Sequence, residues 1–135
     1  MQKTVTFLMF VGDKCGKAEE AMKFYTSLFK NSEIKSVHHF KKDEQGGREG
    51  FIKQGYFTLN GIEYMAIDSP MEHKFSFNPS ISIFVNCDDD KEFEKLYHKL
   101  SENGEILMHP GDYGFSKKFA WLSDRFGISW QLNHA

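Results

Sequence analysis

The chain has 135 residues, of which 40% are hydrophobic and 14 are phenylalanine, and its net charge is −2. That length fits one domain with a sizeable core, and the near-balanced charge excludes the basic surface that nucleic-acid binding needs. No apolar run approaches the roughly 20 residues of a membrane span. Cys15 and Cys87 do not form a secreted-type disulfide framework, and the N-terminus lacks a signal-peptide layout. A cytoplasmic location is therefore expected.

The first half of the chain predicts one strand, one helix and three further strands. Apolar residues recur at helical spacing between Lys17 and Phe29, whereas the segments on either side are short, apolar and rich in β-branched and aromatic residues. Asn60-Gly61 is a strong signal for a two-residue hairpin turn. The predicted strands are Thr4–Val11, Ile34–Phe40, Phe51–Leu59 and Ile62–Ile67.

The second half repeats this order. Asp88-Asp89-Asp90 opens a helix, where carboxylates cap free N–H groups, and Asn103-Gly104 closes it. The predicted strands are Ser80–Asn86, Glu105–Met108, Lys118–Ser123 and Ile128–Leu132. The repeat predicts a single α+β domain over residues 1–135, with one unit at 4–68, a linker at 69–79 and a second unit at 80–132.

Alternation along Ser80–Asn86 separates two faces of that strand. Ile81, Ile83 and Val85 suit the side that a helix covers, and Ser82 and Phe84 point the other way. A sheet face that mixes polar and aromatic side chains is typical of a binding cavity.

Two segments carry a resemblance to a known family. Asp124–Leu132 resembles the last hairpin of the vicinal oxygen chelate superfamily, which includes glyoxalase I, bleomycin-resistance proteins and extradiol dioxygenases. Asp124, Gly127 and Gln131 fall at the spacings of that pattern's Asp, Gly and terminal Glu. The helix Glu19–Phe29 resembles the superfamily's Phe-Tyr helix.

Leu8-Met9-Phe10 before Gly12, together with the ending Trp130-Gln131-Leu132, resembles the PhnB-like branch, whose domain label is 3-demethylubiquinone-9 3-methyltransferase. The resemblance extends from about Thr4 to Leu132 and implies the glyoxalase/bleomycin resistance/dihydroxybiphenyl dioxygenase fold. In that fold, two βαβββ units form a cup-shaped, barrel-like mixed sheet with helices outside. The resemblance also implies a homodimer.

Methyl transfer does not follow from the residues. Only Gly12 and Gly16 flank the first strand–helix junction, and the predicted layout is not the doubly wound parallel sheet that holds an adenosyl cofactor. We therefore regard the label as a poor guide to the activity.

The resemblance also bears on metals, because metal-using members bind a divalent ion through His, Gln and Glu from the first and fourth strands. Here Gln131 stands in the place of Glu, and the His positions fall on Ser80 or Ser82 and on Thr4 or Thr6. Such a site needs about three converging ligands. We expect no bound metal and no cofactor, with Gln131 and Glu63 as a weak alternative pair. The six histidines are expected to be structural or at the surface.

If Gln131 faces the cup, Trp130 belongs to the core. The expected pocket residues are then Thr6, Ser82, Phe84 and Gln131, joined by Phe119 and Trp121 if the last hairpin pairs in register. Cys15 lies between Lys14 and Lys17, an environment expected to lower the pKa of its thiol, although we interpret it as a spectator.

Three functions follow as alternatives. The preferred one is a metal-independent protein that binds a small apolar or aromatic molecule in the cup. The second is a metal-dependent enzyme of lyase, isomerase or dioxygenase type. The third is a protein-interaction or regulatory module whose cup is filled by packed side chains.

Overall fold

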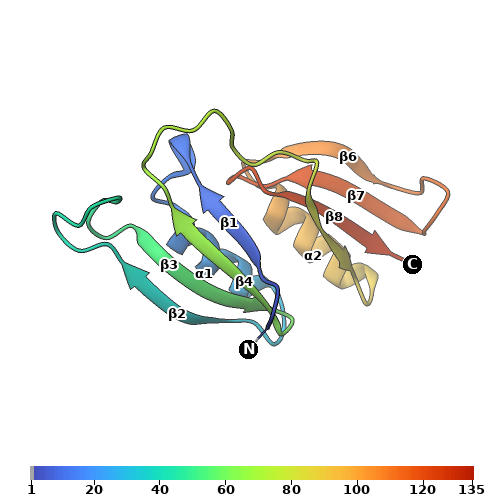
Figure 1. Ribbon diagram of the computed structural model, residues 1–135. Helices are drawn as coiled ribbons and strands as arrows, with labels where there is room; N and C mark the ends of the chain where they lie inside the picture. Colours follow the sequence, from blue (N-terminus) through green and yellow to red (C-terminus); the bar gives the residue numbers. More distant parts are fainter. Residues whose placement is uncertain (1) are drawn as a thin grey trace. The chain divides into compact units, whose positions relative to one another are not determined.

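The computed structural model describes residues 2–135, and the chain divides into two compact units, Met1–Ser76 and Phe77–Ala135, called unit 1 and unit 2. Each unit contains a strand, a helix and three more strands (Figure 1). The α+β class and the paired βαβββ units predicted from the sequence are confirmed. No helix within residues 2–135 is long and apolar enough to cross a membrane.

Unit 1 is a four-stranded mixed sheet with the strand order β1-β4-β3-β2. β1 runs parallel to β4, and the other neighbours are antiparallel. A short 3₁₀ helix, η1 (Gly12–Lys14), was not predicted. The predicted elements of this half are all present, as β1 (Thr6–Phe10), α1 (Ala18–Leu28), β2 (Glu33–His39), β3 (Ile52–Leu59) and β4 (Ile62–Asp68).

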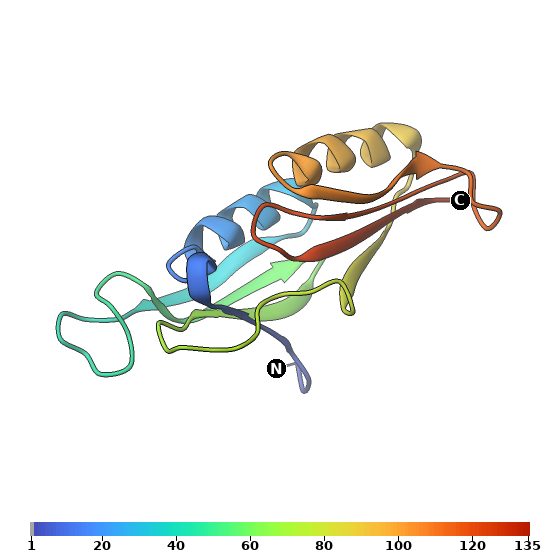
Figure 2. The same ribbon diagram turned by 90° about the horizontal axis from the view of Figure 1, so that it is seen from above.

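α1 covers one face of this sheet because its apolar side is continuous. Met22 and Tyr25 on the helix and Ala66 on β4 are fully buried. A Cβ added at Gly55 of β3 would lie 2.8 Å from the sulfur of Met22, so the glycine lets helix and sheet approach closely. Figure 2 shows α1 along one side of the strands of its unit.

Unit 2 repeats the topology with the strand order β5-β8-β7-β6 and a parallel β5–β8 pair. Its elements are β5 (Ser82–Asn86), α2 (Asp90–Ser101), β6 (Glu105–Gly111), β7 (Lys118–Ser123) and β8 (Ser129–His134). β6 runs past the predicted end at Met108 and includes Pro110. A proline is tolerated there because β6 is the edge strand of the sheet.

The start of α2 is capped as the sequence predicted. The Asp89 carboxylate accepts a hydrogen bond from the Glu92 N–H at 2.8 Å, and the Glu92 carboxylate accepts one from the Asp88 N–H at 2.7 Å. The pair resembles a capping box, except that the Glu92 carboxylate accepts from the residue before the N-cap Asp89. It satisfies two backbone donors at the positive end of the helix.

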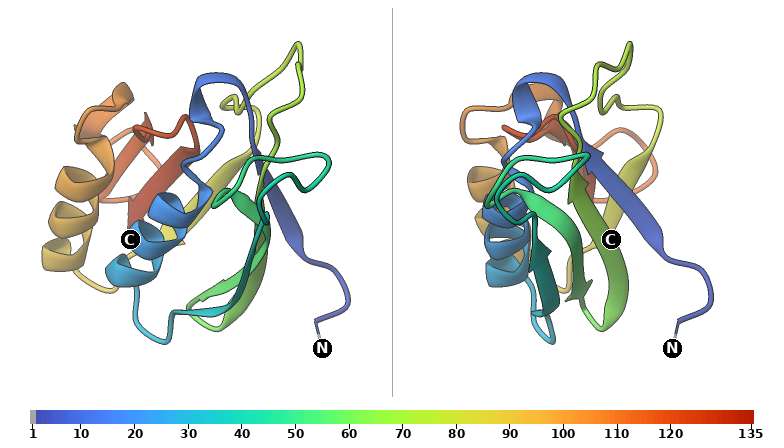
Figure 3. Two further views of the ribbon diagram at one scale, coloured as in Figure 1. Left: turned by 90° about the vertical axis from the view of Figure 1, so that its left-hand side faces the viewer. Right: turned by 60° about the vertical axis from the view of Figure 1, so that its left-hand side comes forward.

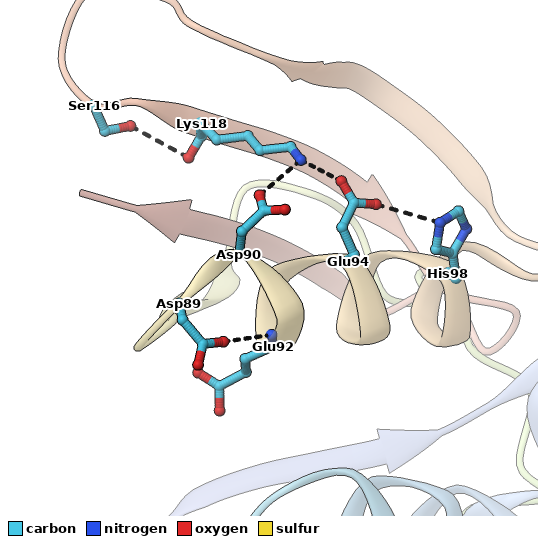
Figure 4. A network of polar contacts seen from close by, with 7 residues as sticks. All are labelled: Asp89, Asp90, Glu92, Glu94, His98, Ser116 and Lys118. Atoms are coloured by element: carbon cyan, nitrogen blue, oxygen red, sulfur yellow. Dashed lines mark hydrogen bonds and ion pairs between the residues drawn. The ribbon is translucent and has the colours of Figure 1, made fainter.

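A salt-bridge network fastens α2 to β7 (Figure 4). Lys118 donates to Asp90 at 2.9 Å and to Glu94, and its Nζ lies 5.0 Å from the centre of the Phe93 ring. His98, one turn after Glu94, pairs with it and is 73% exposed. His98 is thus one of the histidines that lie at the surface, as expected.

A buried carboxylate organises the turn between β7 and β8. Asp124 accepts hydrogen bonds from the N–H groups of Phe126 and Ile128 through Oδ1 and from the Trp130 indole N–H through Oδ2, at 2.8, 3.1 and 2.8 Å. Gly127 has φ +92°, a backbone conformation that other residues rarely adopt. Trp130 is fully buried, so its predicted place in the core is confirmed.

Candidate functional site

The face of the unit 2 sheet that α2 does not cover, here called the helix-free face, carries most of the predicted pocket residues. Cross-strand pairing places Ser82 opposite Ser129, and Gln131 between Phe84 and Trp121. The alternate residues Leu122, Trp130 and Leu132 are fully buried on the other side of the sheet. The register therefore settles the open question of the last hairpin, because Trp121 shares a face with Gln131.

Four of these side chains form a hydrogen-bonded polar cluster. Ser82 Oγ and Ser129 Oγ lie 2.7 Å apart. The Trp121 indole N–H donates to Ser129 Oγ at 2.9 Å, and the Gln131 amide donates to Ser82 Oγ at 3.2 Å. Each of the three strands β5, β7 and β8 thus contributes to one connected group.

This polar cluster has capacity left for a ligand. The two serines hold two hydroxyl protons, and only one can occupy the bond between the two oxygens. The second O–H remains a donor, and Gln131 keeps one amide N–H and its carbonyl oxygen, which takes part in no hydrogen bond within residues 2–135. Ser129 is 1% exposed, so a ligand can reach Gln131 and Ser82, and the spare O–H is that of Ser82 when Ser129 donates to it.

An aromatic cluster lies beside the polar one. Phe119 is nearly buried, and its ring centre lies 4.9 Å from that of Phe115, 6.2 Å from Tyr113 and 6.3 Å from Phe84. The first two contacts are edge-to-face, a favourable geometry for aromatic pairs. Phe84 is 51% exposed and Phe115 is 63% exposed, so much of the cluster remains available for contact.

The remaining predicted residues lie in unit 1. Thr6 is exposed and shares a strand face with Leu8 and Phe10, the face toward α1, whereas Phe7 lies on the opposite face. Glu63 is on the same side as Phe7, and its backbone exchanges hydrogen bonds with the Gln2 side chain. That Thr6, Ser82, Phe84, Phe119, Trp121 and Gln131 bind a ligand stays a prediction.

The donor set does not fit the divalent metal that other members of the fold bind. In unit 1 the helix-free face offers Glu63 with Phe7 and Met65, and in unit 2 it offers the neutral Ser82 and Gln131. Residues 2–135 contain no group of three or more His, Cys, Asp or Glu placed to hold an ion. We therefore derive no chemistry through a metal.

Cys15 differs from its expectation. Burial and, after it, the carboxylate of Asp68 raise the pKa of the thiol, and Arg48 opposes them. The expected lowering of this pKa by Lys14 and Lys17 is wrong, because burial disfavours the thiolate and the carboxylate of Asp68 repels it.

Sequence reasoning missed several residues of this face. Asn133 is next to Gln131 on the same side of β8, donates to Asn86 Oδ1 at 3.2 Å, and keeps a buried Oδ1 without a partner within the described chain. Alternation from Gln131 would have found it. Tyr113 and Phe115 lie in the loop between β6 and β7, where no periodicity gives a direction.

A family model described as 3-demethylubiquinone-9 3-methyltransferase matches residues 2–133. No curated protein matches the chain. Among solved structures, a PhnB protein from Bacillus cereus is 51% identical with a TM-score of 0.93, over 99% of this chain and all of the other. Protein PA1353 from Pseudomonas aeruginosa is 23% identical with a TM-score of 0.82, over 99% and 98% of the two chains.

A fosfomycin resistance protein, FosX, from Listeria monocytogenes is 12% identical with a TM-score of 0.65, over 98% of this chain and 94% of the other. At that identity the likeness concerns the fold alone. The fold is thus that of the glyoxalase, bleomycin-resistance and fosfomycin-resistance superfamily. Within it, the chain belongs to the PhnB-like family that carries the methyltransferase description.

Proposed function

We propose that this protein binds a small molecule on the helix-free face of unit 2 without a metal. A flat aromatic or apolar part of the ligand contacts Phe84 and its aromatic neighbours, and a polar group meets Ser82 and Gln131. The observation that carries the proposal is the adjacency of a polar cluster with spare hydrogen-bonding groups and an aromatic cluster whose Phe84 is 51% exposed. Sites of this composition are typical of small-molecule recognition.

A metal-dependent reaction and a methyl transfer are less well supported. The first would need about three converging ligands, and residues 2–135 contain no group of three or more His, Cys, Asp or Glu placed to hold an ion. The second is usually built on an open, mainly parallel sheet with a glycine-rich turn, whereas each unit here has one parallel pair among four strands. A homodimer remains an expectation from the resemblance, and a cytoplasmic location remains an expectation from the cysteine content and the N-terminal sequence.

The two tryptophans give a direct test. Trp121 lies in the polar cluster, whereas Trp130 is fully buried and donates to Asp124. A ligand on this face should therefore quench the fluorescence of Trp121 and leave that of Trp130 unchanged. We expect 4-nitrobenzamide to quench the tryptophan fluorescence saturably once the fluorescence is corrected for absorbance by the ligand. Nitrobenzene, which lacks the amide, should bind more weakly. Trp121→Phe should abolish the saturable part. Linear quenching, or equal quenching in Trp121→Phe, would contradict the proposal.

A matched pair of variants locates the polar contact. Ser82→Ala removes the hydroxyl that Gln131 and Ser129 share, whereas Ser80→Ala removes an exposed hydroxyl outside this cluster. We expect Ser82→Ala to weaken 4-nitrobenzamide binding about tenfold, the effect of one hydrogen bond of roughly 1.4 kcal/mol, and Ser80→Ala to leave it unchanged. Equal affinities for both variants would place the ligand elsewhere.

A further inference from the structure

Unit 1 contains a pocket of about 280 Å³ that belongs to neither cluster of unit 2. Three segments line it: the η1 turn with Gly12 and Cys15, the loop before β3 with Arg48 and Phe51, and the segment 69–73 that follows β4. Figure 3 shows the loop and the segment rising from the same end of the unit 1 sheet.

A buried carboxylate fixes the walls of this pocket. Asp68, 2% exposed, accepts hydrogen bonds through Oδ1 from the N–H groups of Gly16 and Ala18, at 2.7 and 3.1 Å, and through Oδ2 from that of Ile52, at 2.9 Å. It thereby joins the start of α1 to the start of β3. Its charge is offset by these three donors and by the positive end of α1.

Arg48 brings a cation to the wall. Its guanidinium lies 6.0 Å from the centre of the Phe51 ring, and its carbonyl oxygen accepts from the Phe51 N–H at 3.0 Å, so the turn holds the two residues together. Within residues 2–135 it forms no ion pair. A guanidinium carries five donors in a planar fork that suits carboxylate and phosphate oxygens.

The segment 69–73 adds polar and apolar groups to the lining. The His73 ring nitrogen Nε2 and Ser69 Oγ lie 2.9 Å apart, which fixes the imidazole at the pocket. Pro70 and the exposed Met71 supply apolar surface. Glu72 is the acidic side chain of the lining; it is exposed and lies beyond ion-pair distance of Arg48.

We propose that this pocket is a second ligand site, independent of the unit 2 face, which takes a small molecule bearing a carboxylate or phosphate group on an apolar body. Arg48 binds the anionic group, and His73 with Ser69 supplies further polar contacts. Phe51, Pro70 and Met71 contact the apolar body. Glu72 opposes the anion and limits the affinity.

Cys15 allows the charge preference to be measured inside the pocket. In a Cys87→Ala background it is the single thiol, and its alkylation rates by anionic iodoacetate and neutral iodoacetamide give a ratio from which the pKa of the thiol cancels. We expect Arg48→Met to lower the iodoacetate-to-iodoacetamide ratio on the order of fivefold and Glu72→Gln to raise it. A ratio that neither substitution changes would overturn the proposal.

Occupancy is tested by protection of the same thiol. Benzoate and phenyl phosphate should slow the reaction of Cys15 with iodoacetamide, and benzyl alcohol should not. The anion that protects the thiol at the lower concentration shows whether the pocket prefers a carboxylate or a phosphate. Arg48→Met should remove the protection, and Arg125→Met, which removes an arginine stacked on Phe126 in unit 2, should leave it intact. No protection at millimolar anion, or equal protection by benzyl alcohol, would overturn the site. Protection that persists in Ser82→Ala, the variant expected to weaken binding on the unit 2 face, would separate this site from the proposed function.

Discussion

The two units share one topology but differ at the central position of the helix-free face. On the helix-free face of unit 1, the row Phe7–Met65–Tyr56 crosses β1, β4 and β3; on that of unit 2, the row Phe84–Gln131–Trp121 crosses β5, β8 and β7. The two phenylalanines are similarly exposed, at 49% and 51%. The central position differs, because an apolar methionine replaces a hydrogen-bonding glutamine.

Both units also contain one nearly buried aspartate that accepts three hydrogen bonds, but at different places. Asp68 joins the start of α1 to β3, and Asp124 fixes the last hairpin. In both units a buried carboxylate thus joins separate segments, whereas the central residue of the helix-free face is apolar in unit 1 and polar in unit 2. Binding chemistry can therefore be present in one unit without its twin.

The largest expected effect comes from these aspartates. Asp68→Ala and Asp124→Ala each leave three donors without their acceptor, and each should lower the free energy of unfolding by about 3 kcal/mol or more. Calorimetric melting measures the loss. Only Asp124→Ala should shift the Trp130 emission. Equal shifts in both variants would show that the aspartates do not act within their own units.

The cysteines offer the next contrast. Burial raises the pKa of Cys87 in unit 2 to about 11. Because the folded pKa lies above the unfolded one, its contribution to stability is complete below about pH 9 and is lost as pH rises toward 11. The free energy of unfolding, measured with urea, should fall between pH 8 and pH 10.5 by on the order of 2 kcal/mol less in Cys87→Ala than in the unsubstituted protein. Parallel curves for both proteins would contradict this.

A smaller effect is expected at the Lys118 network. Lys118→Met removes the contacts to Asp90 and Glu94 but keeps an apolar stem over Phe93. We expect a loss of about 0.5 to 1 kcal/mol, since the side chain is 25% exposed and its partners are more so. In 1 M salt, the difference between the two proteins in the free energy of unfolding by urea should become smaller. A difference that salt leaves unchanged would mean that Lys118 stabilises the protein by packing and not by its ion pairs.

The smallest effect concerns the corresponding contact in unit 1. Glu19 on α1 accepts from His39 on β2 at 2.9 Å, and this hydrogen bond lowers the pKa of Glu19. Because the folded pKa is lowered, the stabilisation is present above the ordinary pKa of 4.5 and is lost as pH falls through the folded value. In thermal melts between pH 6 and 3, His39→Gln should lack the part of the fall in stability that comes from protonation of Glu19. An unchanged pH profile would contradict the role of the pair.

Periodicity predicted the helices and strands because both helices are one-sided and most strands alternate. It also placed Gln131 opposite Trp130 correctly, since the side-chain period of a strand is two. It did not give the face on which Thr6 lies, because a shift of one residue reverses every side chain of a strand and β1 is apolar on both sides. The hydrogen bonds of Asp68 and the thiol of Cys15 depend on contacts between distant segments, which no local pattern reveals.

The parallel pairing within each unit has a kinetic consequence. Thr6 pairs with Tyr64 and Ser82 with Ser129, so each sheet is completed by the strands that lie farthest apart in the sequence of that unit. Local hairpins such as β3–β4, turned at Asn60-Gly61, close a short loop, whereas these parallel pairs close a long one and form more slowly. We therefore expect the hydrogen bond between Ser82 and Ser129 to form in the last step of folding of unit 2. A face competent to bind is therefore a marker that folding of unit 2 has finished.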